Sequence, residues 1–122
     1  MMPSTTTFRR GAVVVVDVPF SNHSGVKPRP ALVVSAQHFH QKLPDIIVCP
    51  ISSQPRYYRR PAPGDHPLKN WRVAGLRHPS TVRISKVLAV DKLIMRRRLL
   101  GTLSQDDLAK VDTHLRVALG LR

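Results

Sequence analysis

Residues 11–35 read GAVVVVDVPFSNHSGVKPRPALVVS and place two apolar runs on either side of a polar loop. Valine and other residues with high β propensity dominate both runs, which is typical of buried strands. We predict one strand over residues 12–20 and a second over residues 31–36. The loop between them is too long for a two-residue hairpin turn.

Arg29 lies between Pro28 and Pro30, at the front of the second predicted strand. Each proline fixes its own φ and pushes the preceding residue toward extended geometry, so the backbone at Arg29 has few alternatives. A guanidinium presents a planar set of donors that matches two phosphate oxygens. The segment therefore predicts a phosphate-binding site. The alternative is that the prolines only end one strand and begin the next, with Arg29 solvated.

The chain beyond this segment continues the β pattern. A nearly continuous apolar run predicts a third strand over residues 45–51, and the polar residues 37–44 before it are predicted to hold one short helical turn. The basic, proline-rich residues 56–64 predict a mobile loop. Further strands are predicted over residues 71–76, 80–88 and 98–103, with Arg83 and Lys86 on opposite faces of the second of these.

The C-terminal residues carry the pattern of one amphipathic helix. Ser104 is a good N-cap, and Asp106 and Asp107 complement the positive end of a helix. Apolar side chains then recur on one face up to a stop at Gly120. Five to six short strands with one terminal helix predict a mainly β fold with minor α content, arranged as a small, strongly curved antiparallel barrel.

Length and composition favour one small intracellular domain. At 122 residues the chain can form a single core, and we divide it into a flexible N-terminus (1–8) and one domain (9–122). No apolar run approaches the ~20 residues of a membrane span. Residues 1–7 lack a secretory signal pattern, so we expect a cytoplasmic protein. The single cysteine, Cys49, is expected to be a small core residue.

The charge balance indicates a polyanionic partner. There are 20 Lys and Arg against 7 acidic residues, all of them Asp, for a net charge of +13. A genomic base bias would explain why arginine is preferred over lysine, but it leaves the shortage of acidic residues unexplained. A field of this sign speeds association with phosphate backbones and makes affinity salt-dependent. Nucleic acid is therefore the expected partner.

Several other chemistries lack the residues that they require. His38 and His40 have no neighbours that would complete a zinc site, and no glycine-rich phosphate loop is present, so no metal or cofactor is expected. Arg29 and the run Ser52-Ser53-Gln54 both lie at strand boundaries. If their strands are antiparallel neighbours, Arg29 and Ser52 can approach one phosphodiester and stabilise its transition state while a ribose 2′-OH attacks.

Five blocks of sequence, in order, resemble the MazF/PemK (Kid) toxins of type II toxin–antitoxin systems. They are RRGAVVVVDVPF, KPRPALVVS, DIIVCPISSQ, AGLRHPSTVRISKVLAVDK and LGTLSQDDLAKVDTHL, and the resemblance covers residues 9–121. It implies an SH3-like barrel of the CcdB/PemK type with a C-terminal helix. It also implies a homodimer, and a cognate antitoxin protein that occupies the RNA groove.

The resemblance further implies an endoribonuclease that cleaves single-stranded mRNA selectively and without a metal ion. In such enzymes the 2′-OH attacks the adjacent phosphate and leaves a 2′,3′-cyclic phosphate and a 5′-OH. The family's catalytic arginine falls on Arg29 and its catalytic threonine on Ser52, which keeps the hydroxyl and loses a methyl group. Ala12 stands where the family usually has an acidic residue.

The proposed RNA contacts are Asn22, His23, Lys27, Ser53, Gln54, Arg83 and Lys86. Arginine is effectively always protonated, so Arg29 is assigned to charge stabilisation or proton donation, and the general base stays open with His23 as a candidate. Two alternatives remain: a CcdB-like inhibitor of DNA gyrase that acts without catalysis, and an RNA-binding relative without turnover.

Overall fold

The strands of the protein form one curved antiparallel sheet, and two of the apolar runs of the sequence lie in β1 and β3. The structure is a computed structural model that describes residues 8–19 and 26–122. Within them the sheet has seven strands in the order β4-β5-β3-β2-β1-β7, and β6 pairs with β3. The strands are β1 (Ala12–Pro19), β2 (Val26–Val33), β3 (Asp45–Ser52), β4 (His66–Pro67), β5 (Thr81–Val82), β6 (Leu88–Asp91) and β7 (Met95–Thr102).

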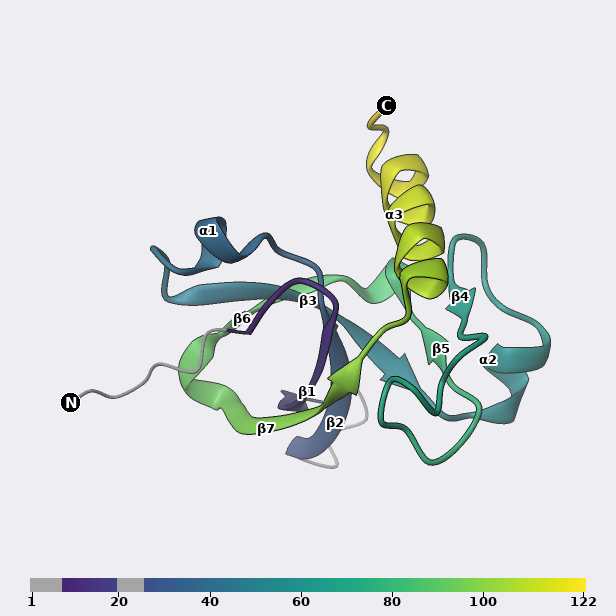
Figure 1. The fold of residues 1–122 in the computed structure, drawn as a ribbon, viewed down its shortest axis with the longest axis horizontal. Helices are drawn as coiled ribbons and strands as arrows, with labels where there is room; N and C mark the ends of the chain where they lie inside the picture. The colour runs from purple at the N-terminus through teal and green to yellow at the C-terminus, as the bar shows by residue number, and fades with distance from the viewer. Residues whose placement is uncertain (1–7, 20–25) are drawn as a thin grey trace.

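Three helices accompany this sheet. They are α1 (Gln37–His40), α2 (Pro55–Arg59) and α3 (Gln105–Leu119). In Figure 1, α1 lies at the end of β3 that is near β6, and α2 lies at the opposite end beside β5, while α3 stands at one side of the curved sheet. The prediction of a mainly β, SH3-like curved sheet with a C-terminal helix is confirmed. No helix in the described ranges is long and apolar enough to cross a membrane.

The core has two parts because the alternating residues of β1 and β2 are buried on both faces of the sheet. One part gathers around Val13, Leu32 and Val111, and so lies between the sheet and α3. The other gathers around Val14, Val16 and residues from β3, β6 and β7, inside the curve of the sheet. Cys49 is fully buried in the first part, as predicted, and this burial raises the pKa of its thiol to about 12.

Four segments differ from the sequence-based predictions. β2 starts at Val26, five residues before the predicted start at residue 31, so the prolines lie inside the strand. Residues 71–76 form turns rather than a strand, and the predicted strand over residues 80–88 is interrupted after Val82 by a short 3-10 helix, Ile84–Lys86. Within the basic segment 56–64, residues 56–59 belong to α2, which has a proline in its first turn as helices favour.

Candidate nucleic-acid interface

A cationic groove with a volume of about 630 Å³ crosses the junction of β2, β7 and the segment before β5. Among its described lining residues are three arginines, Arg29, Arg77 and Arg98, which provide fixed positive charge. Apolar side chains of β7 and the prolines of β2 make up much of the remaining wall. The full lining is Val15, Pro28, Arg29, Pro30, Ser53, Gly75, Leu76, Arg77, His78, Ser80, Arg98, Leu99 and Leu100.

Arg29 lies in the middle of a paired strand. It pairs with Val16 of β1, and Pro28 and Pro30 pair with the residues on either side. The β2–β3 ladder comprises Ala31, Leu32 and Val33, so Pro28 and Pro30 lie outside it, at an edge where a sheet tolerates residues without an N–H. The prolines therefore hold Arg29, half-buried, in an extended backbone at the groove rather than at a turn.

Ser52 is the last residue of β3 and lies near the same end of the β2–β3 pair as Arg29. The two strands are antiparallel neighbours, and the last pair of their ladder is Ala31 with Pro50, so Arg29 and Ser52 each lie two residues beyond that pair at the same end. Ser52 is half-buried, and its Oγ accepts a hydrogen bond from the backbone N–H of Gln54 at 3.2 Å. The next residue, Ser53, is the serine that lines the groove.

A second hollow of about 490 Å³ adjoins the groove. It is lined by Ser53, Pro55, Tyr58, Arg59, His78 and Pro79, so it shares Ser53 and His78 with the groove. Tyr58 is fixed there because its hydroxyl donates to the carbonyl of Leu68 at 2.8 Å. Because they share these two residues, the two hollows together form a path that is lined by the arginines of the groove and by Arg59 of α2.

The wall of the groove at Gly75 requires glycine. Gly75 has φ +82°, and a Cβ there would lie 2.0 Å from the carbonyl oxygen of Leu100. Gly101 lies on the other side of the same contact, and a Cβ added there would lie 2.6 Å from the backbone of Ala74. This close backbone packing places Leu76, Arg77 and His78 directly against β7.

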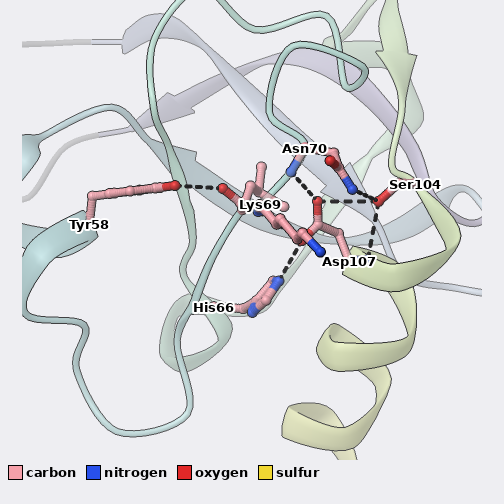
Figure 2. Close-up of polar contacts among 7 residues, drawn as sticks. Tyr58, His66, Lys69, Asn70, Ser104 and Asp107 are labelled. Atoms are coloured by element: carbon pink, nitrogen blue, oxygen red, sulfur yellow. Dashed lines mark hydrogen bonds and ion pairs between the residues drawn. The ribbon is translucent and has the colours of Figure 1, made fainter.

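A buried carboxylate anchors the segment that leads into this wall. Figure 2 shows Asp107 of α3 accepting hydrogen bonds from the backbone N–H groups of Lys69 (2.9 Å) and Asn70 (2.8 Å) and contacting the ring of His66 (2.8 Å). Burial alone would raise the pKa of Asp107, but these hydrogen bonds lower it. Ser104, the N-cap of α3, accepts from the backbone N–H of Asp107 and from the amide of Asn70.

Arg83, a predicted RNA contact, is held by neighbouring side chains. Its Nε donates to the buried Asp65 at 2.5 Å, and its guanidinium lies 3.9 Å from the ring centre of Tyr57. Burial alone would lower the pKa of Arg83, but Asp65 raises it. Arg83 does not line the groove.

The other predicted contacts occupy different positions. Lys27, Gln54 and Lys86 are exposed, and Gln54 is the N-cap residue of α2. Asn22 and His23 lie outside the described residues. Among the residues that the structure describes, no group of three or more His, Cys, Asp or Glu side chains could hold a metal ion.

Sequence reasoning missed Arg77, His78 and Arg98 as groove residues. Arg77 and His78 come directly before Pro79, so this segment has the same arrangement of a basic residue before a proline that predicts a site at Arg29. Arg98 lies in a run of three arginines that shows no preference for one face by sequence alone. Their common location depends on the contact between the Gly75 turn and β7.

Comparisons with known proteins agree with this fold. The family model described as PemK-like, MazF-like toxin of type II toxin-antitoxin system matches residues 9–119, and no curated protein matches. A mycobacterial endoribonuclease, solved in complex with its cognate antitoxin, superposes with a TM-score of 0.75 at 21% identity, over 94% of this chain and 97% of its own.

Two further structures are similar. MazF from a MazE-MazF crystal structure of Deinococcus radiodurans gives a TM-score of 0.74 at 22% identity, over 95% of this chain and 99% of that one. The Mycobacterium tuberculosis toxin MazF-mt6 gives a TM-score of 0.68 at 19% identity, over 89% and 98% respectively. At these identities the superpositions establish the fold, and the family model establishes membership. The chain belongs to the PemK-like, MazF-like toxins of type II toxin–antitoxin systems.

Proposed function

We propose that this protein acts as a sequence-selective endoribonuclease that cleaves single-stranded RNA without a metal ion. The observation that carries the proposal is the position of Arg29, which lines a cationic groove at the end of the β2–β3 pair where Ser52 also lies. Family membership and the endoribonuclease among the similar structures support the same reaction class. The groove's three arginines favour a phosphate-bearing substrate.

The proposed reaction is a transesterification within the RNA strand. The 2′-oxygen loses its proton and bonds to the adjacent phosphorus, the bond from phosphorus to the 5′-oxygen breaks, and the 5′-oxygen takes up a proton. The products are a 2′,3′-cyclic phosphate and a 5′-OH. Arg29 stabilises the charge that grows on the non-bridging oxygens or donates the proton to the leaving oxygen, and the bound geometry aligns the attacking 2′-OH.

Ser52 is assigned a hydrogen bond to the phosphate. Its Oγ accepts from the N–H of Gln54, so its own hydroxyl proton can be donated to a phosphate oxygen. The turn between β3 and α2 thus orients the hydroxyl without the methyl group that a threonine would supply. We expect Ser52→Thr to retain cleavage, because the hydroxyl and its acceptor geometry are kept.

Arg29→Ala and Ser52→Ala are each expected to slow RNA cleavage by at least ~10²-fold, the usual effect of removing a preorganised donor. Purified protein is incubated with long single-stranded RNA in the presence of a chelator, and the fragment ends are sequenced and tested for cyclic phosphate. Arg116→Ala serves as the control, because Arg116 is exposed on α3 and does not line the groove. Circular dichroism confirms that each variant is folded.

Three results would contradict this proposal. Undiminished cleavage by either variant removes the role assigned to that residue. Intact RNA together with inhibition of DNA supercoiling would indicate a gyrase inhibitor instead. RNA that is bound but never cut would indicate a binding protein without turnover.

We also propose that this toxin lies in the cytoplasm and has a cognate antitoxin protein as its partner. We infer that a cognate antitoxin covers the groove, as supported by the similar structures that were solved together with an antitoxin. We also propose that the toxin is a homodimer. Copurification of the coexpressed pair and loss of cleavage in the complex test the first point, and light scattering on the free toxin tests the second.

A further inference from the structure

His78 lies where the groove and the second hollow adjoin. It lines both, and among the described residues it shares that property only with Ser53. A strand of RNA that follows the path from Arg29 and Arg98 toward Arg59 has to pass it. The side chain is exposed and so accessible to a substrate.

The backbone of His78 is held in place although its ring is not. Pro79 restricts the preceding residue to extended geometry, and the buried hydroxyl of Ser80 donates to the carbonyl of His78 at 2.8 Å. Ser80 is itself anchored, because its carbonyl accepts from the N–H of Leu68 at 2.9 Å. These contacts fix the backbone position from which the imidazole extends, and they leave both ring nitrogens available.

The other histidines of the described chain are occupied or lie elsewhere. His40 is buried and bonded to Ser35 and to the carbonyl of Phe8, and His66 is bonded to Asp107. His114 packs against His66 at 5.8 Å between ring centres, and His38 is exposed on α1. Across residues 8–19 and 26–122, His78 is the histidine that lines the groove, and no hydrogen bond engages its ring.

The proposed reaction needs a proton acceptor, and the other groove residues that the structure describes do not supply one. Arg29, Arg77, Arg98 and Arg59, the charged groups that line the two hollows with His78, stay protonated. The hydroxyl of Tyr58 already donates to a carbonyl. Histidine is the side chain that ordinarily changes charge between pH 5 and 8, and a neutral imidazole is the usual general base.

We propose that His78 is the general base of the cleavage reaction and that it accepts the proton of the attacking 2′-OH. This inference rests on the proposed ribonuclease function. A ring nitrogen of His78 takes the proton as the 2′-oxygen bonds to phosphorus. The bond to the 5′-oxygen breaks, and that oxygen takes a proton from water or from Arg29, which regains it from solvent at once, while the imidazolium returns its proton to solvent.

The first test compares His78→Gln with wild type on an RNA oligonucleotide that contains a mapped cleavage site. Glutamine keeps a polar side chain but does not titrate in this range. Under single-turnover conditions the variant is expected to be ~10²- to 10⁴-fold slower, the usual contribution of a general base. The wild-type rate is expected to rise with pH while the general base loses its proton and then to level off, and the variant is expected to lack this rise. His38→Gln is the matched control and should retain both rate and profile.

The second test separates a base from an acid and from a binding contact. An RNA with sulfur in place of the bridging 5′-oxygen has a leaving group that needs no protonation, so the defect of His78→Gln should persist on it if His78 is the base. The Kd for an uncleavable RNA, methylated on the attacking 2′-oxygen, should be unchanged.

Each contrary result has a distinct meaning. An active wild type with an unaffected His78→Gln overturns the role of His78 and leaves the ribonuclease assignment standing. Rescue by the sulfur substrate, or a loss of affinity that matches the loss of rate, also overturns the base assignment. A wild-type protein that cleaves no RNA overturns the proposed function and this inference together.

Discussion

At the residue scale, two hydroxyl groups opposite each other in the β3–β5 ladder have different surroundings. Ser52 accepts a hydrogen bond from Gln54, whereas Thr81, its partner in the ladder, is fully buried and its Oγ1 has no hydrogen-bond partner among the described residues. A buried polar atom without a partner costs ~1–3 kcal/mol of stability. The hydroxyl of Thr81 is therefore a local defect in a fully buried side chain.

Thr81→Val is therefore expected to raise the free energy of unfolding by about 1 kcal/mol, because the apolar replacement keeps the shape and removes the unpaired oxygen. Urea denaturation at neutral pH measures it. Ser35→Ala is the contrasting variant, since the buried Oγ of Ser35 bonds to the ring of His40 and to the N–H of Ile47, and its loss should be destabilising. A less stable Thr81→Val would show that the hydroxyl is satisfied in solution.

At the scale of the element, the first turn of α3 makes hydrogen bonds to a segment far away in the sequence. Ser104 caps the helix, and Asp107 extends from the same turn to bond the backbone of Lys69 and Asn70, as Figure 2 shows. These bonds fix the segment that precedes the turns at residues 71–75 and hence the groove wall. The helix therefore contributes to the site without supplying a groove residue among those described.

Asp107→Asn is expected to lower the free energy of unfolding at pH 7 by about 2 kcal/mol, because charge-assisted hydrogen bonds to buried donors are lost. The folded-state pKa of Asp107 lies below its ordinary value, so its contribution is complete above pH ~3.9 and is lost as pH falls through the folded pKa. Urea unfolding at pH values from 2 to 7 should show the two proteins converging at low pH. A difference that does not change with pH would exclude the carboxylate as its source.

At the scale of the whole molecule, the fold gathers part of the net charge of +13 along one groove. Arg29, Arg77 and Arg98 are far apart in the sequence but line one groove, and the second hollow adds Arg59. A single strand that contacts these residues releases counterions, so its affinity must fall with salt. The charge excess thus serves both long-range attraction and local phosphate binding.

Arg98→Gln is expected to weaken binding of an uncleavable RNA and to reduce the slope of log affinity against log salt concentration by about 0.7, the value for one lost phosphate contact on a single strand. Arg116→Gln makes the same change in net charge on an exposed part of α3 outside the groove and should leave the slope nearly unchanged. Fluorescence anisotropy at several salt concentrations measures both. Equal slopes for the two variants would show that net charge alone governs binding.

Local patterns were sufficient for the first and third strands, for α3 with its Ser104 cap, and for the burial of Cys49, but they placed the start of β2 five residues too late. They failed at residues 71–76 and 80–88, because turns and a 3-10 helix there are imposed by contacts with distant segments. The antiparallel pairing of the strands that carry Arg29 and Ser52 was a condition of the sequence argument, and the structure meets it, while the chemical roles of the two residues stay predictions.

The sequence by itself determined the β-rich class, the terminal helix, the positive charge and the constrained arginine, because each depends on neighbours within a few residues. Only the tertiary structure decided that His78 and Arg98 line the same groove as Arg29, and that Arg83 is held by Asp65. These placements depend on the approach of Gly75 to Leu100 and on buried hydrogen bonds between segments far apart in the chain. The physical reason is that local propensity carries no information on which distant backbones meet.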